Sequence, residues 1–152
     1  MRYRAIWLLL CLALLSCDET GDNYIEGSLA KKLKIDFDDV RVRLYESELS
    51  IEYIENDGDS GEKVSLRVTM LVSAGPLVKG GSYDLKSSGT VSRGAGYGSS
   101  IPAITSGELN LDDYKGEDGS TASGEFKALF STDNKTQYTL RGGFNAKLEV
   151  VM

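Results

Sequence analysis

The chain has 152 residues, two cysteines, no histidine and a formal net charge of −6 at pH 7. Ser-His-Asp and Cys-His catalytic sites need a base that titrates near neutrality, so the missing histidine excludes both classes. The same composition excludes zinc sites built from histidine and cysteine. Nucleic acid is not an expected partner, because phosphate contacts need clustered lysines and arginines, and no such cluster stands out in this acidic chain.

The first segment combines a positive start with a short apolar run. Arg2 and Arg4 precede the uncharged residues 5–16, a run of twelve. A bilayer-spanning helix needs about 20 residues, whereas twelve lies within the range of a secretory signal peptide. The run ends at Leu14-Leu15-Ser16-Cys17, which resembles the lipobox of bacterial lipoproteins. The resemblance implies that residues 1–16 are a lipoprotein signal peptide and that acyl chains are attached at Cys17.

Processing before Cys17 would leave 136 of the 152 residues and no free thiol, because Cys11 is lost with the signal. The loss of Arg2 and Arg4 changes the formal net charge from −6 to −8. Two or three acyl chains on one residue hold a protein firmly on a bilayer. We therefore expect a location in the bacterial cell envelope, with the lipid bilayer as partner through acylated Cys17. Asp18 resembles the inner-membrane retention signal of enteric bacteria, but other bacteria sort by different rules, so both membranes stay open.

Residues 17–27 are acidic, polar and interrupted by glycine, which predicts a lipidated cysteine followed by a flexible tether. Residues 28–152 are then predicted to form a single β domain. The stretch 28–37, "SLAKKLKIDF", satisfies two patterns. Leu29 and Leu33 are spaced as on a helix face, with Ser28 as a candidate cap, whereas Leu33, Ile35 and Phe37 alternate as in a strand. We favour the strand.

Apolar and polar residues alternate along most of the remaining chain. Residues 40–53 predict an antiparallel hairpin with arginines of the first strand beside glutamates of the second. Further strands are expected at 64–72 and 82–85, and a Gly/Ser-rich loop around one short strand at 87–103. Four more strand-like runs follow, at 106–114, 123–130, 136–143 and 144–151. The pattern predicts an all-β fold, an antiparallel β-sandwich or small barrel of about eight strands.

Short motifs in this body are similar to those of small β-rich lipoproteins that bacteria export. They are "GSYDL" (residues 81–85), "SGELNL" (106–111), "SGEFKALF" (123–130) and "LRGGFNAKL" (140–148). The resemblance implies a β-rich exported domain and no particular activity.

One acidic turn invites comparison with a calcium loop. Asp57 and Asp59 are spaced like the first two ligands of such a loop. Gly61 occupies the fifth position and Val68 the twelfth, where further oxygen ligands are needed. The turn is therefore predicted to be a flexible hairpin connection with at most a weak calcium site, and we predict neither a cofactor nor a metal centre.

The segment "RGAGYG" (residues 93–98) has three alternating glycines, but a dinucleotide-binding fingerprint needs its third glycine at a different spacing. A dinucleotide site also needs a preceding parallel strand and a following helix, and "SSIP" begins no helix. We predict a mobile loop instead. Because loops on rigid scaffolds often carry binding residues, Arg93, Tyr97 and Ile101 are our candidate binding residues.

Paired acids such as Asp112 and Asp113 do not favour a hydrolase, because neighbouring residues of a strand face opposite sides of the sheet. No catalytic residue is predicted. The leading hypothesis is a non-enzymatic, membrane-anchored lipoprotein with a structural or binding role. The alternative is a carrier that binds a small apolar ligand inside a β-barrel. The alternative fails if the interior is filled by side chains, for which the candidates are Phe126, Phe130, Tyr138, Leu140 and Phe144.

Overall fold

The computed structural model describes residues 21–152. Cys17 and the predicted signal peptide lie outside this range. The described part contains nine strands and three short helical segments. They are β1 (Tyr24–Glu26), α1 (Ser28–Leu33), β2 (Asp39–Leu44), β3 (Glu48–Asp57), β4 (Gly61–Leu71), the 3-10 turn η1 (Val72–Ala74), β5 (Ser82–Asp84), α2 (Leu85–Ser88), β6 (Gly89–Ser92), β7 (Ala103–Asp113), β8 (Thr121–Ser131) and β9 (Gln137–Val150).

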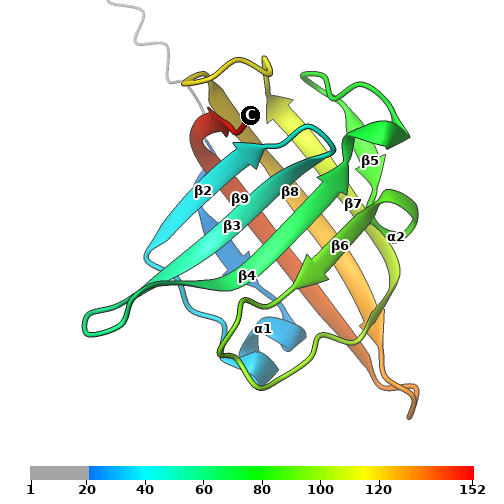
Figure 1. Cartoon of the computed structure of the whole chain (residues 1–152). Helices are drawn as coiled ribbons and strands as arrows, with labels where there is room; N and C mark the ends of the chain where they lie inside the picture. The colour runs from blue at the N-terminus through cyan, green and yellow to red at the C-terminus, as the bar shows by residue number, and fades with distance from the viewer. Residues whose placement is uncertain (1–20) are drawn as a thin grey trace, which may run out of the picture.

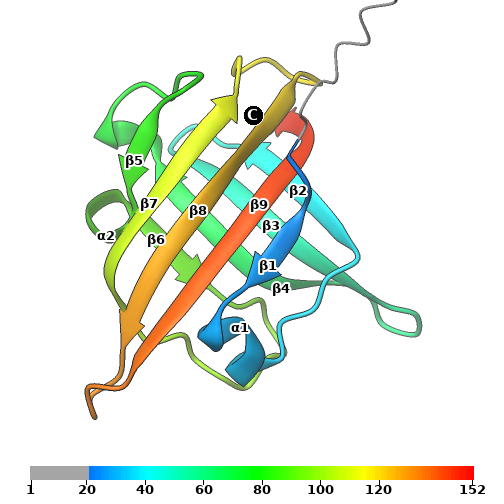
Figure 2. The same cartoon turned by 180° about the vertical axis from the view of Figure 1, so that it is seen from behind.

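The strands form one sheet in the order β5-β7-β8-β9-β2-β3-β4-β6, which curls into a nearly closed barrel (Figure 1). β2, β3, β4 and β6 form one wall, and Figure 2 shows β7, β8, β9 and β1 forming the other. α2 connects the two edge strands and places the fully buried Leu85 against the core. The predicted all-β fold is confirmed. One pairing departs from the antiparallel expectation, because β2 runs parallel to β9.

The last two predicted strands, 136–143 and 144–151, form the single strand β9. Gly142 and Gly143 continue this strand where we expected a break. A Cβ at Gly142 would lie 2.4 Å from a ring carbon of Phe126 and 2.8 Å from the Tyr53 hydroxyl. A Cβ at Gly143 would lie 2.4 Å from the Tyr24 ring. The two glycines therefore make room for aromatic rings on both faces of the strand, a known use of glycine inside strands.

The strand predicted over residues 28–37 is wrong, because residues 28–33 form α1. Leu29 is fully buried and Ala30 nearly so, and α1 lies across one end of the barrel (Figure 1). Lys34 ends the helix in the left-handed conformation, with φ of 50°. Ser28 does not cap the helix. Its hydroxyl instead accepts a hydrogen bond from the backbone N–H of Thr139, at 2.9 Å.

The boundary predicted between the tether, residues 17–27, and the domain lies too late in the chain. Tyr24–Glu26 form β1, which pairs antiparallel with β9 opposite Gly143, Gly142 and Arg141. The Tyr24 ring lies over Gly143, and its hydroxyl donates to Glu125 Oε1 at 3.1 Å. Burial and this bond raise the pKa of Tyr24. A packed aromatic ring with a satisfied hydroxyl explains why this polar stretch is ordered.

Aromatic side chains fill the interior of the barrel. Tyr53, Phe126, Phe130 and Phe144 are fully buried, as is Leu140. The Tyr53 hydroxyl donates to the backbone carbonyl of Gly143 at 2.8 Å, so the one polar group among these rings is paired. Tyr53 and Phe126 meet edge to face, with ring centroids 6.2 Å apart.

Replacing Gly142 with alanine should destabilise the fold. The added methyl group would collide with rings held in a closely packed interior, and such overpacking costs about 1–3 kcal/mol or more. The measurement is the midpoint of urea unfolding. Gly58→Ala is the matched control, because an added Cβ there meets nothing within 4 Å. Equal midpoints for the two variants would contradict the packing role of Gly142.

Candidate functional site

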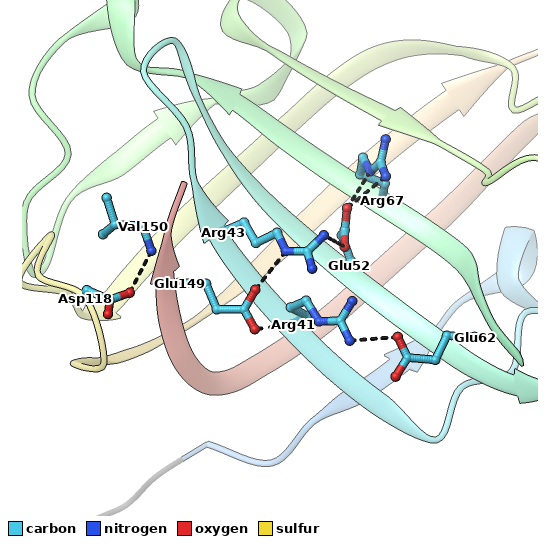
Figure 3. A network of polar contacts seen from close by, with 8 residues as sticks. All are labelled: Arg41, Arg43, Glu52, Glu62, Arg67, Asp118, Glu149 and Val150. Carbon is cyan, nitrogen blue, oxygen red and sulfur yellow. Dashed lines mark hydrogen bonds and ion pairs between the residues drawn. The ribbon is translucent and has the colours of Figure 1, made fainter. Parts of the chain in front are cut away.

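The outer face of β2, β3 and β4 carries the densest group of charges that the structure describes (Figure 3). Alternation along each strand turns Arg41, Arg43, Glu52 and Arg67 away from the core. The antiparallel register places Glu52 between Arg41 of β2 and Arg67 of β4. The arginine and glutamate pairing predicted for the hairpin is therefore confirmed.

Glu52 is the buried member of this network. It is only 1% exposed although it faces outward, because long arginine side chains lie on both sides of it. Arg67 donates to Glu52 Oε1 from Nη2 at 2.8 Å and from Nε at 3.0 Å. Arg43 Nη1 lies 3.4 Å from Glu52 Oε2. A carboxylate withdrawn from water in this way requires charged partners, and these arginines supply them.

Further glutamates neutralise the outer ends of the arginines. Glu149 of β9 lies 2.8 Å from Arg43 Nε, because the parallel β2–β9 pairing brings these two residues side by side. This hydrogen bond raises the pKa of Arg43. Arg41 pairs with Glu62 at 2.8 Å and, more weakly, with Glu149 at 3.8 Å. Three arginines and three glutamates thus cancel one another's charge, and the face presents paired groups to solvent.

The candidate binding residues Arg93, Tyr97 and Ile101 lie against the barrel. Arg93 donates to the carbonyl of Leu33 at 2.9 Å and to that of Ser65 at 3.0 Å. Its guanidinium lies 4.0 Å from the centre of the Tyr97 ring, and Ile101 packs against the core. These contacts fasten the loop to α1 and β4. A binding role for the three residues stays a prediction.

The two calcium candidates lie in the β3–β4 turn. Asp57 Oδ2 accepts a hydrogen bond from Ser60 Oγ at 2.6 Å and also pairs with Lys63, which lowers the pKa of this carboxyl. Asp59 is exposed. Within residues 21–152, no three acidic, histidine or cysteine side chains are grouped so that they could hold a metal ion.

Two hollows open on the outside of the barrel. One, of about 470 Å³, lies over β7, β8 and β9 and is bordered by Glu108, Lys127, Leu129 and Arg141. The other, of about 510 Å³, lies where β2 and β9 end. The interior is occupied by the aromatic side chains described above, with Tyr138 half-buried near α1. Four of the five side chains named as candidates for filling the interior are thus fully buried, and the carrier alternative stays a prediction.

The buried state of Glu52 is a feature that sequence reasoning missed. Alternation correctly placed the side chain on the outer face, where glutamate is ordinarily exposed. Its neighbours on β2 and β4 bury it, and those neighbours follow from the strand register. Ser50, two residues earlier on the same face, is also buried, and its hydroxyl has no hydrogen-bond partner among the described residues.

The chain matches none of the family models, curated proteins or solved structures with which it was compared. No helix within residues 21–152 is long and apolar enough to cross a membrane.

Replacing Glu52 with glutamine should cost about 2 kcal/mol of unfolding free energy. The substitution keeps the shape of the side chain but leaves Arg43 and Arg67 beside a neutral group, and removing one member of a buried pair is costly. Glu62→Gln is the control, because Glu62 is exposed and such pairs contribute less than about 1 kcal/mol. Urea unfolding measures both changes. A loss for Glu62→Gln as large as that for Glu52→Gln would contradict this view.

The Tyr97 phenol should titrate near pH 12 in the folded protein. Burial and the hydrogen bond that Tyr97 donates to Glu55 Oε2, at 2.5 Å, raise its pKa from 10.0 to about 12. Because the folded state holds this proton more tightly, the contribution of Tyr97 to stability is complete below pH 10 and is lost as the pH rises through about 12. The measurement is the difference in tyrosinate absorbance between the natural chain and Tyr97→Phe. Glu55→Gln should lower the midpoint, and an unchanged midpoint near 10 in the natural chain would exclude the contact.

Proposed function

We propose that this protein is a lipid-anchored, non-enzymatic component of the bacterial cell envelope, in which a solid β-barrel has a structural or binding role. The anchor is acylated Cys17, and residues 1–16 act as the signal peptide. The barrel faces the periplasm or the cell exterior.

The non-enzymatic part of the proposal is supported by the separation of an apolar interior from a charged outer face. The interior is filled by Tyr53, Phe126, Phe130 and Phe144, and the charged groups lie outside in neutralising pairs. General acid–base chemistry depends on titratable groups held in a concave site. The carboxylates of this network instead stabilise arginines across a sheet surface. A binding role accordingly uses the outer surface of the barrel.

The anchoring part draws support from the lipobox and from the position of β1. Asn23, only six residues after Cys17, already accepts a hydrogen bond from the backbone N–H of Asn145. A folded domain thus begins almost directly after the predicted lipidation site. A short connection of this kind suits a protein that works close to a membrane surface.

Intact mass of the protein purified from bacterial membranes tests the proposal. We expect a chain that begins at Cys17 and carries the added mass of a diacylglyceryl group, with or without a further acyl chain. Cys17→Ala should remove this mass and release the protein from the membrane fraction. A natural protein that begins at Met1, or one with an unmodified Cys17, would contradict the anchor. Pull-down with the lipidated protein and with Cys17→Ala then identifies partners that require the membrane location.

A further inference from the structure

The barrel has one end that is rich in exposed apolar side chains. Five large apolar side chains are exposed among residues 21–152. All but Leu129 lie at this end: Leu71 is paired with Glu48 beside the β2–β3 turn, Val151 is bonded to Leu44, Met152 follows it, and Val78 belongs to the β4–β5 loop that is bonded to Leu111 near the end of β7. We define them as the apolar end: Leu71, Val78, Val151 and Met152. Both views show the C-terminus and the β2–β3 turn at this end, opposite α1 (Figure 1, Figure 2).

Backbone hydrogen bonds hold the segments of this end together. The N–H of Val151 donates to the carbonyl of Leu44 at 2.9 Å, and the N–H of Val72 donates to the carbonyl of Ser47 at 2.9 Å. These bonds join the C-terminus and the end of β4 to the β2–β3 turn. Between them lies the hollow of about 510 Å³, lined mainly by Leu44, Tyr45, Val72, Val150, Val151 and Met152.

The N-terminal segment approaches the barrel from the same end. β1 runs antiparallel to β9, so residues before Tyr24 lead toward the C-terminal end of β9. Six residues from Cys17 to Asn23 reach at most about 20 Å when fully extended. Asn23 contacts Asn145, and the five residues from there to Val150 span about 17 Å along the strand. Cys17 can therefore extend only slightly past the apolar end.

We propose that the apolar end rests on the surface of a phospholipid bilayer and fixes the orientation of the barrel. This inference rests on the proposed acylation of Cys17, because the short connection is what brings the apolar end to the membrane. Apolar side chains of interfacial proteins enter the boundary between headgroups and acyl chains, where the apolar face of an amphipathic helix reaches a depth of about 5–10 Å. The exposed carboxylates Glu46, Glu117 and Asp118 belong to the loops of this end. They favour zwitterionic headgroups, since anionic lipids repel them.

Tryptophan reporters test this orientation in the natural, full-length gene product. The only tryptophan, Trp7, lies in the predicted signal peptide, so each variant of the processed protein contains one reporter. Leu71→Trp and Met152→Trp place it at the apolar end, and Asn134→Trp places it in the β8–β9 turn near α1. Each purified lipoprotein is inserted into phosphatidylcholine vesicles with brominated acyl chains, which quench nearby tryptophan. We expect loss of fluorescence at 71 and 152 and none at 134.

A second substitution in the reporter variant distinguishes a specific contact between the apolar end and the bilayer from general proximity to the bilayer. Val151→Ser should reduce the quenching of the reporter at 71, whereas Leu129→Ser, which removes the exposed apolar side chain of β8, should leave it unchanged. Replacing part of the phosphatidylcholine with phosphatidylglycerol should also reduce it.

Intact mass and light scattering, recorded on the same samples, distinguish the outcomes. An unmodified Cys17 overturns both the anchor and the orientation. A lipidated protein with equal quenching at 71 and 134 overturns the orientation alone. A third outcome is that the reporters at 71 and 152 are unquenched and that light scattering shows a dimer, which Val151→Ser dissociates. That outcome would make the apolar end a contact between two copies of this chain, and it would also overturn the membrane contact.

Discussion

The barrel depends on the close approach of Tyr53 and Phe126 to the backbone of Gly142. These rings come from β3 and β8, and they meet over β9, which has no side chain at the point of contact. The Tyr53 hydroxyl reaches the carbonyl of Gly143, so an aromatic group enters the interior without leaving a polar atom unpaired. This contact has a functional consequence. The proposed binding role therefore concerns the outer surface of the barrel.

The outer face of β2, β3 and β4 depends on the same strand. β9 pairs with β1 in its middle and with β2 near its end, and the second pairing is parallel. Glu149 is thereby held beside Arg43, which in turn contacts Glu52. The buried carboxylate is thus supported by residues of three strands and pairs with arginines on both sides. Such a network makes a stable, neutral face, and this explains why the clustered charges are compatible with a structural or binding role.

The sequence predicted those features that depend on local periodicity. The β2–β3 hairpin, the β3–β4 turn and the pairing of arginines with glutamates all follow from alternation along residues 40–72. Glycine pairs usually mark turns, so the sequence predicts two strands in place of β9, whose continuity depends on rings contributed by distant strands. The apolar spacing of residues 28–37 fits both a strand and a helix, and the burial of Leu29 at the end of the barrel decides for the helix α1. The three residues of β1 are too few to show any period.

The charged face of β2, β3 and β4 was harder to predict, because it also depends on contacts between distant segments. The burial of Glu52 and the parallel partner of β2 are properties of register across the sheet, and neither leaves a local pattern. The loop from Arg93 to Ile101 has the composition of a mobile segment, yet one arginine joins it to two backbone carbonyls of other elements. The sequence indicates these residues as candidate binding groups, whereas their contacts with α1 and β4 depend on the folded arrangement of distant segments.

The short connection to Cys17 also explains how a small apolar surface can matter. Four exposed side chains bury too little area to hold a soluble protein on a membrane by themselves. The proposed acylation of Cys17 changes this balance, because an anchor six residues before Asn23 keeps the apolar end at a high effective concentration beside the bilayer. In the proposed anchoring, the acyl chains supply the affinity, and the apolar end selects among the orientations that the connection to Cys17 permits. In the proposed orientation, α1 and the loop that Arg93 joins to it face away from the membrane, so the end of the barrel left open to partners includes a loop held by two hydrogen bonds to backbone carbonyls.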